Sequence, residues 1–288
     1  MSYEDVSRDN SQRKKRKRCL LLGVAVVLLT VIVFAVVLGL TLNRATNSGE
    51  VLKDTVISRC KTYLKEYANL TSVNDCERIW GAFEQAYLGK DPCEVHPEAY
   101  DPLINSVTDH VFCGTMLFWS KTKTVVHEFT DNRECLFTLE DTLLGFLFDE
   151  LTWCSKNNSQ EIFTTGCPGW SECVNNPVRS FWIRASANFA VTACGNVSAM
   201  LNGSLELPFS TTGVFGSIEV KNLDPNKVDG LTVLLVTKET DTTTCANPSF
   251  QTLRNTLDPN IALNCRQVPY GKVENCISNL DIPCNDCF

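Results

Sequence analysis

The residues of this chain that could do chemistry are carboxylates and tryptophans. Glu140 lies in an apolar segment, FTLEDTLLGFLFDELTWC at 137–154, and Glu219 follows FGSI in a short apolar run. Removing a carboxylate from water costs several kcal/mol unless it is paired, protonated or facing a wet cleft. Trp119 and Trp182 adjoin polar or turn residues, so either ring could line a cleft and stack on a flat ligand. This set suits cleavage of a glycosidic bond on a stacked substrate, or a binding site.

The segment around Glu140 is predicted to form one amphipathic helix. Thr138 and Asp141 have the spacing of a capping box at a helix N-terminus, where an acid satisfies unpaired N–H groups, so a structural role is predicted for Asp141. Asp149 lies about 180 degrees from Glu140, so both acids can face one pocket only if the helix bends, and Gly145 is the expected place. Steps of about 100 degrees per residue place Glu140 among the leucines of one arc: Leu139, Leu143, Leu144, Leu147 and Leu151.

Glu219 is predicted to lie on a strand over 214–220. Neighbours on a strand alternate between faces, so Glu219 would share a face with Ser217 if Ile218 and Val220 are buried. The alternative is an acid that simply faces solvent. Each tryptophan has an alternative too, as a core residue.

Several other kinds of site are not supported. Gly213 to Gly216 lacks the GxGxxG fingerprint, and the chain has no GxxxxGK[ST] loop and no GxSxG. None of His96, His110 and His127 has HxxxH spacing, so we expect no metal site and predict surface or hydrogen-bonding roles for them. No cofactor is expected.

Residues 19–42 are 24 uncharged, almost wholly apolar positions. At about 1.5 Å per residue such a helix exceeds a bilayer core of about 30 Å, so we predict a transmembrane signal-anchor helix. A secretory signal peptide is the alternative, but its apolar part would be only about 7 to 15 residues long. RKKRKR at 13–18 precedes the span, which predicts a cytoplasmic tail at 1–18 and a type II protein of the cell membrane.

Residues 43–288 are then expected outside the cell. Fourteen of the 15 cysteines lie there, which indicates a disulfide framework in an oxidising compartment. This part carries 19 basic and 30 acidic residues, so nucleic acid is not an expected partner. Four sequons predict glycosylation at Asn69, Asn157, Asn196 and Asn202.

Along residues 43–288, the order of the helix and strand patterns predicts helices first and then an α/β unit with a small, largely buried sheet. Predicted helices cover 51–68, 76–89, 137–153 and 180–201, and predicted strands cover 115–120, 214–220 and 231–237.

Five segments together resemble the ADP-ribosyl cyclase/cyclic ADP-ribose hydrolase family. They are FWSK at 118–121, TLEDTLLGFLFDELTWC at 138–154, NPVRSFW at 176–182, MLNGS at 200–204 and FGSIEV at 215–220. The resemblance covers essentially all of residues 43–288. With its predicted span, the chain looks like the type II transmembrane member of the family on leukocyte surfaces.

The resemblance implies mixed α and β structure, with a helical domain and a parallel-sheet α/β domain flanking a cleft. The helical part would cover about 43–112 and 138–193, and the α/β part about 113–137 and 194–288. Glu219 would be the catalytic glutamate, while Glu140 and Asp149 would line the nicotinamide end. The remaining implied substrate-binding residues are Trp119, Trp182, Ser186, Lys121, Phe215 and Val214. Lys121 replaces an arginine and Val214 a threonine of the nearest relatives, which affects expected phosphate affinity and product ratio.

The resemblance also implies six disulfides. Cys135 and Cys287 are left over, although Cys287 could replace Cys284, and an odd thiol could stay free or link two chains. The implied pairs are Cys60 with Cys76, Cys93 with Cys173, Cys113 with Cys194, Cys154 with Cys167, Cys245 with Cys265, and Cys276 with Cys284.

The activity implied is cleavage of NAD to nicotinamide plus ADP-ribose or cyclic ADP-ribose, hydrolysis of cyclic ADP-ribose, and base exchange on NADP. A non-catalytic receptor or adhesion ectodomain is the main alternative, and a carbohydrate hydrolase is the second. A homodimer or a cell-surface protein ligand is also compatible with the sequence.

Overall fold

A computed structural model describes residues 28–38, 48–66, 75–107 and 113–288 of this chain, which forms two units, residues 1–51 and 52–288. In the first unit, residues 28–38 of the predicted span are helical, with exposed apolar side chains. The rest of that span and the sequon at Asn69 lie outside the described residues. Over the ranges that are described, no helix has both the length and the apolar character needed to cross a membrane.

The second unit contains a parallel sheet of four strands in the order β1-β2-β3-β4. Parallel neighbours need crossover connections, and helices lie between the strands along the chain. The predicted small parallel sheet is therefore confirmed, although the sequence patterns predicted only β1 and β3 of it. The strands are β1 (Leu117–Ser120), β2 (Gly195–Asn202), β3 (Val228–Thr237) and β4 (Ala262–Pro269).

Both faces of the sheet are covered by helices, as the apolar β-branched strands require. On one face Val197, Val233 and Leu235 share a core with Phe189 of α6 and Leu253 of α8. The other face packs against α4 and α9 through a second core, whose members include Leu117, Met200, Leu234, Val126, Phe129 and Val273.

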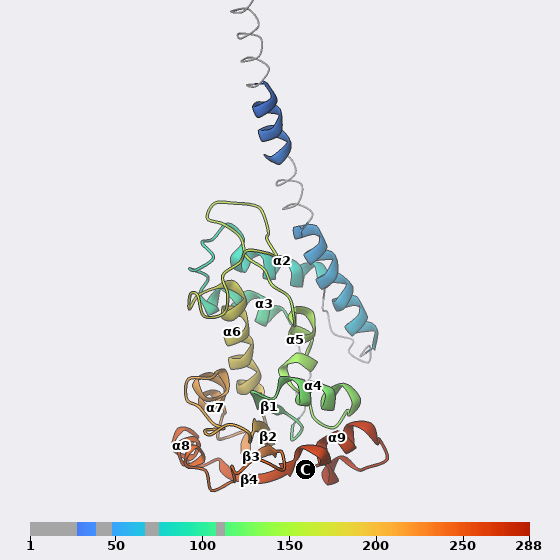
Figure 1. The fold of residues 1–288 in the computed structure, drawn as a ribbon, viewed down its shortest axis with the longest axis vertical. Coiled ribbons are helices and arrows are strands. Elements are labelled where there is room, and N and C mark those ends of the chain that lie inside the picture. The colour runs from blue at the N-terminus through green and yellow to red at the C-terminus, as the bar shows by residue number, and fades with distance from the viewer. Residues whose placement is uncertain (1–27, 39–47, 67–74, 108–112) are drawn as a thin grey trace, which may run out of the picture. The chain divides into compact units, whose positions relative to one another are not determined.

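Figure 1 shows α2, α3 and α5 gathered at one end of this unit and the sheet with α7, α8 and α9 at the other, with α6 running between them. The helices are 48–66, α2 (Cys76–Tyr87), η1 (Pro97–Tyr100), α3 (Asp101–Ser106), α4 (Lys123–Asn132), η2 (Leu139–Asp141), α5 (Leu143–Phe148), α6 (Pro177–Thr192), η3 (Phe215–Glu219), α7 (Val220–Asn222), α8 (Pro248–Thr256), α9 (Tyr270–Ser278) and η4 (Cys284–Asp286).

Three predicted elements are wrong. The single helix at 137–153 is divided into η2 and α5, because Thr142 adopts an extended conformation and caps α5 by accepting a hydrogen bond from the Gly145 N–H. The predicted strand at 214–220 is a π-helical turn, η3, followed by α7. The predicted helix at 180–201 ends at Thr192, and Gly195, at φ +69°, begins β2.

Seven disulfides connect the described cysteines. Five of the expected pairs are present: Cys60–Cys76, Cys93–Cys173, Cys113–Cys194, Cys154–Cys167 and Cys245–Cys265. The expected Cys276–Cys284 pair is wrong, and the alternative in which Cys287 replaces Cys284 is confirmed: Cys276 bonds to Cys287, and Cys284 bonds to Cys135. Sequence spacing at the C-terminus could not distinguish two cysteines only three positions apart.

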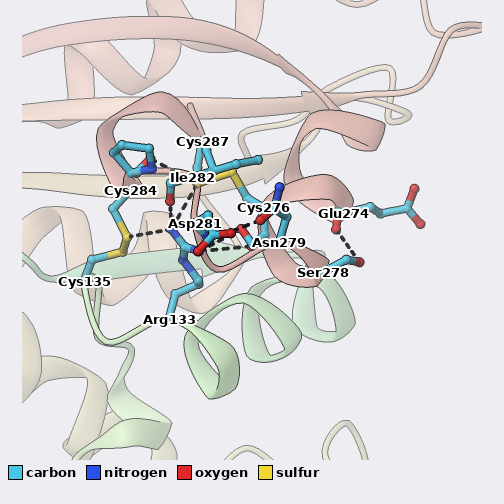
Figure 2. Close-up of a disulfide and its surroundings, with 11 residues drawn as sticks. Arg133, Cys135, Glu274, Cys276, Ser278, Asn279, Asp281, Ile282, Cys284 and Cys287 are labelled. Atoms are coloured by element: carbon cyan, nitrogen blue, oxygen red, sulfur yellow. Dashed lines mark hydrogen bonds between the residues drawn. A yellow bond between two sulfur atoms is a disulfide. The ribbon is translucent and has the colours of Figure 1, made fainter.

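Arg133 lies between the two C-terminal disulfides, at the end of α4 (Figure 2). Its buried guanidinium donates to the carbonyls of Cys276, Asn279 and Ile282, the last of these the shortest contact. Arginine can satisfy several acceptors at once through its planar donors. The C-terminal segment is thereby fastened to α4, the helix that carries His127.

Candidate active site

Glu140 and Trp119 meet although they come from different elements. Trp119 lies near the carboxyl end of β1, and its indole Nε1 donates to Glu140 Oε2 at 3.1 Å. The carboxyl ends of parallel strands are where ligands commonly bind in α/β folds. Only 13% of the Glu140 side chain is exposed. The acid is therefore held by a specific partner rather than by open solvent.

Local structure explains how Glu140 reaches this place. The capping box predicted for Thr138 and Asp141 is confirmed, with the Asp141 carboxylate accepting from the Thr138 N–H at 2.7 Å. That box starts the short turn η2, which ends before Thr142. Glu140 consequently lies on a separate turn and not on the apolar arc of a continuous helix.

Gly145 keeps this turn close to α5. A Cβ atom at Gly145 would overlap the Leu139 carbonyl oxygen and lie 2.5 Å from Cα of Glu140. Glycine is thus required here for close approach between two backbone segments. The bend expected near Gly145 occurs three residues earlier, at Thr142.

Glu219 is the most perturbed carboxylate of the described residues. It ends the π-helical turn η3 and is 8% exposed. Burial raises the pKa of Glu219 to about 8; a hydrogen bond with the buried Ser186 side chain opposes this shift, and the negative charge of Glu140 adds to it. A π-helical turn often marks a functional site. Glu219 and Glu140 therefore influence each other electrostatically across one site, as the resemblance implies.

Helix α6 supplies Ser186 and Trp182, which are one helical turn apart and so lie on the same face. The Trp182 ring is half-buried and packs edge-on against Phe181 at 5.1 Å. Phe215 is buried between Phe118 and Phe209, with ring centroids 6.1 and 6.0 Å away, and half-buried Val214 precedes it. These contacts fix the start of η3 and with it the direction of Glu219.

Asp149 and Lys121 make their contacts away from Glu219. Asp149 caps the end of α5, and its carboxylate pairs with Lys123 at 3.2 Å. Lys121 has φ +60° directly after β1 and lines a pocket of about 670 Å³ together with Trp119. Glu219 does not line that pocket. The ligand-binding roles implied for Asp149 and Lys121 stay predictions.

His127 is a residue of this site that the sequence patterns did not single out. It lies on α4, with Nε2 3.6 Å from Glu140 Oε2 and its ring edge-on to the Trp119 indole at 5.6 Å. The sequence predicts for it only a surface or hydrogen-bonding role, and no motif marks it as part of the site. The three-dimensional meeting of α4 with η2 creates the contact.

Charges at Glu140 and His127 support each other. Burial acts to raise the pKa of Glu140, but His127 and the Trp119 indole outweigh it, and the pKa is lowered. Burial alone would lower the pKa of His127, yet Glu140 beside it raises that pKa above its ordinary value. Among the described residues, no group of His, Cys, Asp and Glu could hold a metal ion.

The chain is similar to known enzymes over most of its length. It is 39% identical over 235 residues to "ADP-ribosyl cyclase/cyclic ADP-ribose hydrolase 1" of Rattus norvegicus, covering 80% of this chain and 78% of that protein. A structure described as porcine CD38 with a covalent intermediate, ribo-F-ribose-5'-phosphate, aligns with a TM-score of 0.71 and 38% identity, covering 76% of this chain and 96% of that one. Aplysia cyclase "complexed with substrate NGD and product cGDPR" gives a TM-score of 0.68 at 25% identity, covering 82% and 96%.

A sequence model of a protein family also matches most of this chain. The ADP-ribosyl cyclase model matches residues 49–285, which include β1 to β4, η2, η3 and six of the seven disulfides, all but Cys276–Cys287. On this match and the identities above, the chain belongs to the ADP-ribosyl cyclase family.

Proposed function

We propose that this chain cleaves the bond between nicotinamide and ribose in NAD and releases ADP-ribose or cyclic ADP-ribose, and that it also hydrolyses cyclic ADP-ribose. The observation that carries the proposal is the buried Glu219, whose charge is coupled to that of Glu140. A receptor or adhesion domain would have no reason to retain such a pair. The family and the named activities of its relatives support the same conclusion.

Nicotinamide in NAD is already a cationic leaving group and needs no general acid. The bond between ribose C1′ and the ring nitrogen breaks with both electrons going to nitrogen, so the base leaves neutral and the ribose becomes positive. Glu219 stabilises this charge and holds ribose hydroxyls more strongly as it develops. Capture by water gives ADP-ribose, and capture by adenine N1 gives the cyclic product.

The other site residues take positioning roles in this proposal. Trp119 and Trp182 stack on the substrate and decide how far it folds back, and Ser186 contacts phosphate while holding Glu219. Glu140 and Asp149 lie at the nicotinamide end, while Lys121, Phe215 and Val214 complete the substrate site. NADP is a second substrate through base exchange, and no cofactor is needed.

We further propose a type II membrane protein with residues 43–288 outside the cell. The basic run at 13–18, the apolar residues 19–42 and the acidic, cysteine-rich remainder support this orientation. Asn157 and Asn196 are exposed, as glycan carriers must be. A homodimer and a cell-surface protein ligand are compatible with this placement.

Incubating the purified full-length chain with NAD tests the function. Release of nicotinamide together with ADP-ribose or cyclic ADP-ribose is expected, and chromatography measures all three. A folded chain that binds NAD without releasing nicotinamide would indicate a receptor. Hydrolysis of a carbohydrate with no action on NAD would support the second alternative.

The pH dependence of NAD cleavage follows from Glu219. Because Glu219 acts as a carboxylate and its pKa is about 8, kcat/KM should increase with pH along a limb centred near that value. In the enzyme–substrate complex the positive charge of the nicotinamide ring stabilises the Glu219 carboxylate and lowers its pKa. The corresponding limb in the pH profile of kcat should therefore lie at lower pH than the limb in kcat/KM. Initial rates across the neutral and alkaline range check this. A kcat/KM profile that is flat there would contradict the role of Glu219.

Glu140→Leu should change the product ratio. Removing this buried acid dries the site and disfavours water relative to the tethered adenine, whose attack benefits from high effective concentration. We expect a severalfold higher ratio of cyclic ADP-ribose to ADP-ribose, with slower total turnover. Both products are quantified at equal, early NAD consumption so that hydrolysis of the cyclic product does not distort the ratio. An unchanged or lower ratio would show that Glu140 does not control water here.

A further inference from the structure

His127 occupies a position that the proposed reaction does not explain. Its side chain is only 18% exposed, and Nε2 is buried without a hydrogen-bond partner, since Glu140 Oε2 at 3.6 Å is slightly too distant. Placing a titratable ring there costs free energy unless the ring serves its neighbours. The neighbours are Glu140, which the proposed function places at the nicotinamide end, and Trp119, which it stacks on the substrate.

One oxygen of Glu140 connects the three side chains. Oε2 accepts from Trp119 Nε1 at 3.1 Å and is the atom nearest to His127 Nε2. The imidazole also stands edge-on to the indole, with an interplanar angle of 86°. A rotation of the Glu140 carboxylate away from His127 would therefore also release the tryptophan that is proposed to stack on the substrate.

We propose that His127 is a positioning residue, which in its protonated form holds the Glu140 carboxylate against Trp119 and releases it for ordering water when it is neutral. This inference rests on the proposed function only for its consequence, the choice between water and adenine. The contact between His127 and Glu140 stands on geometry alone.

The charges facing His127 favour a proton on the ring. Glu140 faces it from η2 and Asp149 from the end of α5, while Lys123 on its own helix opposes them. Lys123 is itself paired with Asp149 and Glu150, at 3.2 and 3.8 Å, which weakens that opposition. Arg133, at the end of α4, donates to carbonyls of the C-terminal segment, which fixes the end of the helix that carries His127.

An NMR titration of the imidazole signals tests the contact without any substrate. The chain has three histidines, so single substitutions assign the signals. We expect His127 to titrate above its ordinary value in the wild-type protein and at a lower pH in the Glu140→Gln variant. His96 is the matched control, because its side chain is 61% exposed and lies 3.8 Å from Glu94. A His127 titration that Glu140→Gln leaves unmoved would overturn the proposal.

Product ratios at mildly acidic and alkaline pH test the consequence. In the wild-type chain the ratio of cyclic ADP-ribose to ADP-ribose should fall by roughly two- to fivefold as His127 loses its proton, the size expected for one loosened ion pair. His127→Asn should give the lower, alkaline ratio at both pH values, and His96→Asn should behave as wild type. The double variant His127→Asn with Glu140→Leu should match Glu140→Leu alone.

The outcomes separate the two ideas. If His127 titrates as expected and Glu140→Gln lowers its titration, but the chain does not cleave NAD, the contact between His127 and Glu140 stands and the proposed function is refuted. A ratio that still depends on pH in a folded His127→Asn variant would refute the positioning role, because a merely structural histidine would not set that dependence. If His127→Asn fails to fold, the titration of wild type and Glu140→Gln decides.

Discussion

Glu219→Gln is expected to lose nearly all NAD cleavage and to be more heat-stable than the wild-type protein. The amide keeps the volume of the side chain but removes the charge that stabilises the developing ribose cation. Loss of one preorganised electrostatic group costs about 10²-fold or more in turnover. The same charge is buried, so its removal should relieve the protein of a desolvation cost.

The stability gain should depend on pH in a defined direction. The folded-state pKa of Glu219 is about 8 and its ordinary value is 4.5, so the folded protein binds the proton more tightly than the unfolded chain does. The stability that the Glu219 proton contributes is therefore fully present below pH 4.5, the ordinary pKa. It is lost as the pH rises through the folded-state pKa of about 8. One pKa unit corresponds to about 1.4 kcal/mol, which gives an upper limit of about 5 kcal/mol above pH 8.

Thermal unfolding followed by circular dichroism at acidic and at alkaline pH measures this effect. Glu219→Gln should raise Tm at alkaline pH by roughly 3 °C or more, and by little at acidic pH. Glu239→Gln is the matched control, because Glu239 is exposed in the segment after β3 and should change neither turnover nor Tm. An inactive variant with a lower Tm would mean that Glu219 supports folding; a fully active one would remove it from the mechanism.

Glu140, Trp119, Glu219 and Ser186, which contact or influence one another in the structure, could be named from the sequence and its resemblance, but the conformation that presents them could not be predicted. The run FGSIEV has the alternating β-branched pattern of a strand, yet it forms a π-helical turn between the β2 region and α7. Six residues are too few for periodicity to separate a strand from a helix. Phe215 and Gly216 decide the matter through contacts with Phe118, Phe209 and Ser210, which are distant in the sequence or in a loop.

The ends of helices and strands inside long apolar runs could not be predicted for a related reason. Residues 180–201 are apolar enough for one helix, but α6 ends at Thr192 and β2 begins at Gly195. The glycine was a visible stop signal, because Gly commonly follows the last helical residue. The His127 contact and the Cys135–Cys284 bond had no such signal, since each joins segments whose meeting only the folded chain defines.

Gly145→Ala is expected to disrupt both stability and the active site, although it adds one methyl group to a helix. The added Cβ would overlap the Leu139 carbonyl oxygen and approach Cα of Glu140 to 2.5 Å and the Leu139 carbonyl carbon to 2.6 Å. These are backbone atoms, so no side-chain rotation can relieve the overlap. Either α5 or η2 must move, and movement of η2 carries Glu140 away from Trp119.

The expected cost is roughly 3 kcal/mol or more, the upper range for overpacking a buried site, and it should appear as a lower denaturation midpoint. Gly81→Ala is the matched control: Gly81 lies in α2, a Cβ there meets nothing within 4 Å, and alanine should stabilise the helix by about 0.5 to 1 kcal/mol. The indole hydrogen bond provides a second readout, since separating Trp119 from Glu140 should change the NMR shift of the Trp119 Nε1 proton in any variant that still folds. A Gly145→Ala protein as stable as wild type, with that proton unshifted, would show that η2 and α5 do not need their close approach to hold Glu140 in place.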